Sequence, residues 1–282
     1  MLGTPERLAD LHPTRVLDMG VPGSVRYLDT GERGWHPVVF FGGLGTSAGA
    51  FSLTEFARPL REALGLRFVS VERNGFGETP FTPGLGFEQA IDDVLKVLHV
   101  LRVERFSVVA FSGGGPYAGR LLARVPELVA SLHLAAATPG GELLRRGAAT
   151  AILADLEGIA ADPEGFWEYP PESPVRLIPG FVEASREEGR RALGNPRRAA
   201  SALAHELALL GSWELPDLRE VVTPSFLYWG AHDELVPLEQ AQVWQTVLGP
   251  DVTLRVHADS GHDVQYLHWR EILADVARSA VP

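Results

Sequence analysis

The stretch FSVVAFSGGGPY, residues 106–117, constrains the fold of this chain more than any other part of its sequence. An apolar run rich in valine and phenylalanine ends at Ser112, and three glycines follow at once. This pattern predicts a buried strand that turns sharply into a helix, with the serine at the tip of the turn. Crowding at such a tip requires small residues two positions before and after the serine, and the sequence has Ala110 and Gly114 there.

The spacing around Ser112 matches the G-x-S-x-G motif, with alanine in its first position. In that motif the turn exposes the serine hydroxyl as a nucleophile at the edge of a sheet. The alternative is a glycine-rich connection in which the serine only caps the following helix. Because a serine hydroxyl needs a base and an orienting acid to become reactive, the rest of the chain distinguishes the two interpretations.

Strand and helix patterns alternate on both sides of this turn. The expected strands are residues 37–41, 67–72, 106–111, 131–136, 224–229 and 252–256, preceded by a hairpin over residues 15–30. Helices are expected at residues 53–64, 87–101, 238–248 and 267–280. Alternation of this kind predicts an α/β fold with a mostly parallel sheet that helices cover on both faces.

The alternation stops between residues 139 and 217, where no strand pattern is convincing. Helical patterns at residues 142–160, 181–193 and 196–210 are separated there by segments that contain proline and glycine. We therefore expect a core domain made of residues 1–138 and 216–282, and a helical cap inserted at residues 139–215.

The composition excludes several classes of function. The net charge of −11, from 36 acidic and 25 basic residues, leaves no basic footprint for a nucleic-acid partner. The chain has no cysteine, which excludes disulfides, a thiolate nucleophile and cysteine-based metal sites. The N-terminal segment is charged and no long apolar run follows, so we expect a cytoplasmic protein that does not bind membranes.

A base and an acid for Ser112 are expected where two later strands end. Asp233 comes just after the strand at 224–229, and His262 follows the strand at 252–256 in the loop before the last helix. The carboxyl ends of parallel strands meet at one edge of a sheet, so these side chains can reach the serine. The sequence therefore predicts a catalytic triad of Ser112, Asp233 and His262.

Several neighbouring residues remain alternatives for the base and the acid. They are His232, His257 with Asp259, Glu234 and Asp263. His262 is preferred as the base because it lies beyond a glycine in the loop, whereas His257 directly continues a strand. His133 falls in the middle of an expected strand, so we expect a hydrogen-bonded core residue there.

A serine nucleophile also requires two N–H groups that bind the negative oxygen of a tetrahedral intermediate. The residue after the nucleophile, Gly113, supplies one of them. The loop GGLG at residues 42–45 follows an early strand and is expected to supply the second from Leu44, with Gly43 as the alternative. A phosphate-binding role for this loop is disfavoured because the lysine and hydroxyl residue of a P-loop are missing.

These motifs, in this order, resemble the α/β-hydrolase superfamily from about residue 24 to residue 280. The loop at 42–45, the loop ERNGFGET at 72–79, the turn at 110–118, the run GAHDELVP at 230–237 and the SGH of 260–262 carry the resemblance. The turn is similar to that of capped bacterial hydrolases described as proline-iminopeptidase-like. The resemblance implies an eight-stranded, mostly parallel sheet with the cap after the sixth strand.

The chain departs from the family pattern in its oxyanion loop, which has Gly42 and Gly43 in place of the usual His-Gly. The H-G-G-P-G loop of true proline iminopeptidases is absent, and a serine nucleophile is unlike the aspartate of haloalkane dehalogenases and soluble epoxide hydrolases. Glu72 stands where the family usually has aspartate.

The function expected from these residues is that of a serine esterase acting on a small to medium, largely apolar carboxylic ester. Phe41, Phe111 and Trp167 are the expected pocket residues, and the reaction requires no metal and no organic cofactor. A small-molecule substrate is the expected partner. The alternatives are another chemistry of the same fold, namely C–C bond hydrolysis, perhydrolysis, or a cofactor-free lyase or oxygenase reaction, and a non-catalytic small-molecule receptor.

Overall fold

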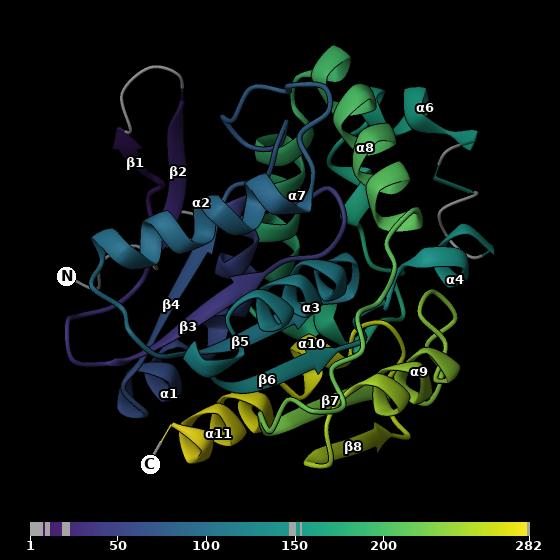
Figure 1. Ribbon diagram of the computed structural model, residues 1–282. Coiled ribbons are helices and arrows are strands. Elements are labelled where there is room, and N and C mark those ends of the chain that lie inside the picture. Colours follow the sequence, from purple (N-terminus) through teal and green to yellow (C-terminus); the bar gives the residue numbers. More distant parts are fainter. Residues whose placement is uncertain (1–7, 9–11, 19–22, 147–150, 153, 281–282) are drawn as a thin grey trace, which may run out of the picture.

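The computed structural model describes residues 8, 12–18, 23–146, 151–152 and 154–280, and its centre is an eight-stranded sheet (Figure 1). The strands are β1 (Arg15–Asp18), β2 (Ser24–Asp29), β3 (His36–Phe41), β4 (Leu66–Val71), β5 (Phe106–Phe111), β6 (Val129–Ala135), β7 (Ser225–Gly230) and β8 (Val252–His257). Their spatial order is β1-β2-β4-β3-β5-β6-β7-β8. Only the β1–β2 and β2–β4 pairs are antiparallel, which confirms the predicted, mostly parallel sheet.

Helices cover both faces of the sheet, as a sheet with apolar strands requires. The core helices are η2 (Ala48–Ala57), α1 (Arg58–Ala63), α2 (Phe87–Val100), η3 (Ser112–Gly114), α3 (Gly115–Arg124), η4 (Pro126–Leu128), α9 (Glu239–Val247), α10 (Val264–Leu267) and α11 (Trp269–Ser279). Phe87 of α2 and Trp244 of α9 belong to one apolar cluster, whereas Phe51 of η2 and Trp269 of α11 belong to another. The last expected helix, at residues 267–280, corresponds to α11, and the short helix α10 precedes it.

The segment between β6 and β7 is helical, as predicted for an insertion after the sixth strand. It contains α4 (Gly141–Arg146), α6 (Leu156–Ala161), η5 (Gly165–Trp167), η6 (Pro174–Leu177), α7 (Phe181–Leu193) and α8 (Pro196–Gly211), and its described residues include no strand. In Figure 1 these helices lie beyond one end of the sheet. The expected helix over 142–160 corresponds to α4 and α6, with residues 147–150 and 153 outside the described part. The division into core and cap domains stays a prediction.

The two long helices of the insertion begin where local sequence favours it. Gly180 precedes α7 with a φ of 78°, a left-handed value that glycine adopts without a steric penalty. The side chain of Asn195 caps α8 by accepting a hydrogen bond from the Arg198 N–H at 3.1 Å, and Pro196 occupies the first helical position. None of the helices in the described ranges is both long and apolar enough to cross a membrane.

Candidate active site

The turn at Ser112 has a strained backbone. The residue has a φ of 48°, a left-handed value that costs roughly 1–2 kcal/mol for a residue with a Cβ. A Cβ on Gly114 would lie 2.5 Å from the carbonyl oxygen of Phe41, so only glycine fits there. The small residue that the sequence places two positions after the serine is thus explained by this close approach to the neighbouring strand.

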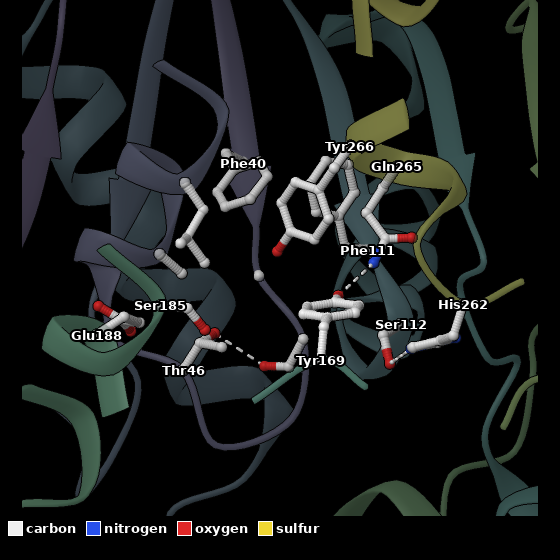
Figure 2. Close-up of a pocket in the computed structure, with 14 residues that line it drawn as sticks. Phe40, Thr46, Phe111, Ser112, Tyr169, Ser185, Glu188, His262, Gln265 and Tyr266 are labelled. Atoms are coloured by element: carbon white, nitrogen blue, oxygen red, sulfur yellow. Dashed lines mark hydrogen bonds between the residues drawn. The ribbon is translucent and has the colours of Figure 1, made fainter. Parts of the chain in front are cut away.

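The structure brings the three predicted triad residues together. His262 Nε2 lies 3.0 Å from Ser112 Oγ, and His262 Nδ1 lies 2.9 Å from Asp233 Oδ2 (Figure 2 shows the serine–histidine pair). The other carboxylate oxygen, Asp233 Oδ1, accepts the N–H groups of Leu235 at 3.0 Å and Val236 at 2.8 Å. Because these bonds orient the carboxylate and the carboxylate orients the imidazole, His262 Nε2 can accept the serine proton.

The alternative acids and bases lie elsewhere. His232 and Glu234 are exposed, and His257 faces Glu271, with 3.5 Å between Nε2 and Oε2. Asp263 accepts hydrogen bonds from Ser173 Oγ at 2.8 Å and from the Gly261 N–H at 3.0 Å, so it fixes the loop around His262.

His133 is the buried, hydrogen-bonded residue that its position predicted. Its ring nitrogens lie 3.1 Å from the Tyr228 hydroxyl and 2.9 Å from Ser131 Oγ. Burial lowers the pKa of His133 to about 3, so the imidazole stays neutral in the core.

The loop around Leu44, the expected second oxyanion donor, is held by side-chain hydrogen bonds. The carbonyl of Gly43 accepts hydrogen bonds from Arg73 Nη2 and, at 2.9 Å, from Thr46 Oγ1. Because the peptide group is planar and trans, the Leu44 N–H points away from that carbonyl. It lies beside Gly113, where a Cβ would be only 2.7 Å from the Leu44 nitrogen. The two predicted donors are therefore neighbours, which favours Leu44 over Gly43.

Arg73 and Glu206 form a buried brace for this loop. Arg73 Nη1 lies 2.6 Å from Glu206 Oε1, an ion pair in which both side chains are buried. Glu206 Oε2 accepts the Gly45 N–H at 2.8 Å, and Oε1 also accepts the Tyr117 hydroxyl at 3.1 Å. Since Glu206 belongs to α8, a helix of the insertion holds the loop that carries the Leu44 amide.

A second carboxylate of the insertion reaches the end of the same loop. Glu188 of α7 accepts the Ser47 N–H at 2.6 Å and the Ser47 hydroxyl at 2.9 Å. Burial raises the pKa of Glu188 to about 7, although the Ser47 bonds and the nearby Arg191 oppose the shift. Both long helices of the insertion thus contact the loop through an acidic side chain.

A small cavity of about 40 Å³ lies next to Ser112 (Figure 2). That volume holds roughly three water molecules. Its apolar side is formed by Phe40, Leu53, Phe111, Tyr169 and Tyr266. Its polar side is formed by Thr46, Ser185, Glu188 and Gln265, together with Ser112 and His262. The arrangement suits a short apolar group attached to a polar reacting centre.

Two of the three expected pocket residues differ in their position relative to the cavity. Phe111 lines the cavity, but Phe41 does not, because successive strand residues face opposite sides and it is Phe40 that points into the cavity. Phe41 instead stacks on Tyr117 in the other core cluster, with 5.9 Å between the ring centres. The side chain of Trp167 lies outside the described part of the structure.

Sequence reasoning missed the residues that hold the oxyanion loop, although α7 and α8 carried a signal for two of them. The buried face of α8 consists of Ala199, Ala202, Leu203, Glu206, Leu207, Leu210 and Gly211. The buried face of α7 places Glu188 in the same way among small and apolar residues. A carboxylate inside an apolar stripe is costly unless it has a partner, and that anomaly could have marked both residues. Arg73 carried no comparable signal.

A protein-family model of the alpha/beta hydrolase family matches this chain over residues 38–276. Among curated proteins, the chain is 26% identical over 247 residues to a dihydrolipoyllysine-residue acetyltransferase component of an acetoin cleaving system from Pseudomonas putida. The match covers 86% of this chain but spans only 62% of the length of that relative.

Solved structures share the fold at low identity. An esterase from Thermogutta terrifontis aligns with a TM-score of 0.67 at 21% identity, covering 96% of this chain and 99% of that one. A 2-hydroxy-6-oxo-6-phenylhexa-2,4-dienoate hydrolase from Rhodococcus sp. strain RHA1 aligns with a TM-score of 0.70 at 19% identity, covering 95% and 98% of the two chains. At these identities the likeness concerns the fold alone.

Proposed function

The chain belongs to the alpha/beta hydrolase family, and we propose that it is a serine hydrolase that cleaves carboxylic esters through an acyl-enzyme on Ser112. The observation that carries the proposal is the continuous series of hydrogen-bonding contacts from Asp233 through His262 to Ser112, with heavy-atom separations of 2.9 and 3.0 Å. A helix-capping serine needs no such partners. A nucleophile needs both of them.

In the first half of the proposed reaction, Ser112 Oγ attacks the ester carbonyl carbon while its proton passes to His262 Nε2. The carbonyl oxygen becomes an oxyanion that accepts the N–H groups of Gly113 and Leu44. Asp233 stabilises the imidazolium that forms. The intermediate collapses when the ester C–O bond breaks, and His262 returns the proton to the leaving alcohol.

In the second half, water replaces the alcohol. It attacks the acyl carbon of the Ser112 ester and gives its proton to His262, which then protonates Ser112 Oγ as the carboxylic acid leaves. The same two amides bind the second oxyanion, and loss of one such donor typically costs about 3 kcal/mol of transition-state stabilisation.

The cavity supports a small, apolar acyl group as the substrate portion next to Ser112. A volume of about 40 Å³ is far below the several hundred Å³ of typical ligand pockets, so longer acyl chains require Tyr169 or its neighbours to move. The structural likeness to an esterase agrees with this proposal but comes from the fold alone.

A panel of p-nitrophenyl esters of increasing acyl length tests the proposal. The wild-type chain is expected to hydrolyse the shortest esters fastest, and Ser112→Ala should lower kcat on the order of 10⁵- to 10⁶-fold. Ser201→Ala, at an exposed serine of α8, is the matched control and should retain full activity. Equal turnover by wild type and Ser112→Ala contradicts the mechanism, and no turnover of any ester favours another chemistry of this fold or a receptor.

A further inference from the structure

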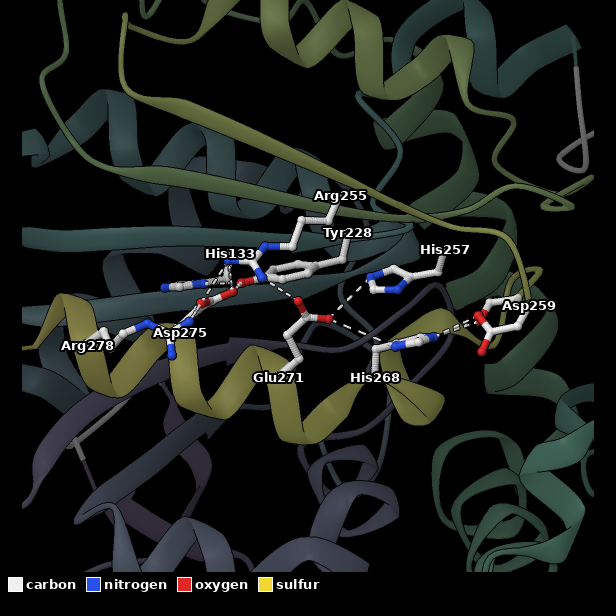
Figure 3. Close-up of polar contacts among 10 residues, drawn as sticks. His133, Tyr228, Arg255, His257, Asp259, His268, Glu271, Asp275 and Arg278 are labelled. Atoms are coloured by element: carbon white, nitrogen blue, oxygen red, sulfur yellow. Dashed lines mark hydrogen bonds and ion pairs between the residues drawn. The ribbon is translucent and has the colours of Figure 1, made fainter.

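A second cluster of polar side chains lies at the two ends of the loop that carries His262 (Figure 3). His257 ends β8, His268 lies between α10 and α11, and Glu271 is in the first turn of α11. Glu271 Oε2 is 3.5 Å from His257 Nε2 and 4.0 Å from His268 Nδ1. One possible ligand atom from each of the three residues lies within 4.8 Å of the other two. Two imidazoles and a carboxylate thus lie close together.

The nitrogen of His257 that faces Glu271 is available. Nε2 is buried and forms no hydrogen bond with the described residues. A neutral imidazole with an unused ring nitrogen is the form of histidine that binds metal ions.

The other two side chains are oriented by neighbours outside the cluster. His268 Nε2 lies 3.0 Å from Asp259 Oδ1 and 3.1 Å from Ser260 Oγ, which leaves Nδ1 facing Glu271. Arg255 Nη1 holds Oε1 of Glu271, which leaves Oε2 facing the histidines. A histidine whose second nitrogen bonds a carboxylate is the arrangement that supports most histidine ligands in metalloproteins.

We propose that His257, His268 and Glu271 bind a divalent transition-metal ion, for which Zn²⁺ fits best. Zinc bonds to imidazole nitrogen and carboxylate oxygen are about 2.0–2.2 Å long, so tetrahedral ligands lie about 3.4 Å apart. The separations of 3.5 and 4.0 Å are close to that value. Imidazole and carboxylate ligands favour zinc over Mg²⁺ and Ca²⁺, which prefer oxygen.

Binding requires a small adjustment of the two rings. Their centres are 3.6 Å apart and their planes differ by 26°, so both rings must turn about χ2 to aim at one ion. That torsion is broad for histidine and the turn is cheap. The side chains of His257, His268 and Glu271 are 14%, 21% and 32% exposed, so water can supply the fourth ligand.

The proposed ion would fasten the loop of the candidate catalytic histidine. His257 and His268 flank residues 258–267, which include His262, and Glu271 belongs to α11. A metal bound by these three residues would link the end of β8 to α11 and restrain the loop from both sides. Its role is structural, because no atom of Ser112, Asp233 or His262 takes part.

Calorimetric titration of Zn²⁺ into the tag-free full-length chain, freed of metal with EDTA, tests the proposal. We expect one equivalent to bind, with Tm raised by roughly 5 °C at a hundredfold excess over Kd. His257→Ala and His268→Ala should each weaken binding at least about tenfold, and Asp259→Asn should weaken it less. His99→Ala, at an exposed histidine of α2, is the matched control and should bind as the wild type does.

Titration of the wild-type chain with Co²⁺ makes the test independent of variant folding. An intense visible absorption, as four-coordinate Co²⁺ gives, is expected and should disappear when Zn²⁺ is added. The weak spectrum of hydrated, six-coordinate Co²⁺ overturns the proposal, as does Zn²⁺ binding that is unchanged in folded His257→Ala and His268→Ala. In either case the cluster is only a set of packed, hydrogen-bonded side chains.

Discussion

The proposed nucleophile and the proposed oxyanion site lie side by side, yet different parts of the molecule hold them. Ser112, Asp233 and His262 each follow a strand of the central sheet and are fixed by one another and by main-chain groups of their own loops. The insertion reaches this group indirectly, because Ser173 donates a hydrogen bond to Asp263, which fixes the loop around His262. The geometry of the three residues is therefore set mainly by the sheet and its loops.

The proposed oxyanion loop, in contrast, is held directly by side chains of the insertion. Glu206 of α8 binds Gly45 and Arg73, and Arg73 in turn binds the Gly43 carbonyl; Glu188 of α7 binds Ser47. The loop lacks the family's usual histidine, and in this chain Arg73 and Glu206 hold the loop through hydrogen bonds to Gly43 and Gly45. In the proposed mechanism, the insertion therefore affects the stabilisation of the transition state through the oxyanion loop rather than through the triad. Changes to the two regions should consequently give different kinetic effects.

The largest effect is expected from the sheet side, in Asp233→Asn. An asparagine cannot hold His262 in the tautomer that accepts the serine proton, so kcat should fall about 10⁴-fold with little change in KM. Steady-state kinetics with a short p-nitrophenyl ester measure the loss. Glu234→Gln, at the exposed neighbour, is the control. A near-normal kcat in Asp233→Asn would show that another acidic residue orients His262.

A smaller effect is expected from the brace, in Arg73→Met. Without Arg73 the Gly43–Leu44 peptide loses its anchor, so kcat should fall about 10²- to 10³-fold while labelling of Ser112 by a fluorophosphonate still occurs. Arg26→Met, at the partly exposed partner of Glu78, is the matched control.

The Arg73→Met variant also leaves Glu206 buried without its cation, which destabilises the fold by about 3–5 kcal/mol. The double variant Arg73→Met/Glu206→Gln removes that charge and should regain stability in urea unfolding without regaining kcat. Recovery of kcat together with stability shows that the brace is structural only.

Glu188 should make stability depend on pH. Its pKa rises from the usual 4.5 to about 7 on folding, so the folded chain holds this proton more tightly than the unfolded chain. The resulting stabilisation of the folded chain is roughly 3 kcal/mol and is fully present below the pKa that Glu188 has in the unfolded chain. It is lost as the pH rises through about 7. Glu188→Gln keeps one oxygen that can accept the Ser47 N–H and places an NH2 group that can donate to the Ser47 hydroxyl, but it cannot ionise.

Urea unfolding at about pH 4.5 and pH 8 measures this effect. The free energy of unfolding of Glu188→Gln, relative to that of the wild type, should be higher at pH 8 than at pH 4.5 by roughly 3 kcal/mol. Glu183→Gln, at an exposed position of α7, should show no such change. If the stability of Glu188→Gln changes between the two pH values as that of the wild type does, the buried Glu188 is not the cause of the pH dependence.

The smallest effect is expected at the cavity wall, in Tyr169→Ala. Removal of the ring enlarges the space beside Ser112, so kcat/KM for a long-chain ester relative to the acetyl ester should rise about tenfold. Competition between the two esters in one assay gives the ratio directly. If the ratio of the two kcat/KM values is unchanged, the acyl group does not bind beside Tyr169. Tyr27→Ala, remote from the cavity, controls for loss of a buried ring.

The sequence was informative where chemistry and strand order coincide. Ser112 follows a strand with glycines after it, and Asp233 and His262 lie in loops after later strands, so residue type and position together predicted their meeting. Helix α7 was predicted at its observed bounds because its helical pattern lies between segments that contain proline and glycine. Each of these features is local along the chain.

The brace and the pocket could not be predicted in this way. Arg73 and Glu206 are more than a hundred residues apart in the chain, and their pairing depends on how the insertion packs against the core. The sequence does not show that Phe40 rather than Phe41 faces the pocket, because the apolar run of this strand contains no alternation that distinguishes its two faces. Such contacts follow from tertiary packing, which a single sequence does not contain.

The central claim is that Ser112 is the nucleophile of this chain. Its most direct test is to treat the wild-type chain with increasing fluorophosphonate, and to compare remaining esterase activity with the fraction of Ser112 phosphonylated, measured by peptide mass spectrometry. The account predicts that activity falls linearly and reaches zero when every chain carries one group on Ser112. Full activity in a chain whose Ser112 is completely phosphonylated would contradict it.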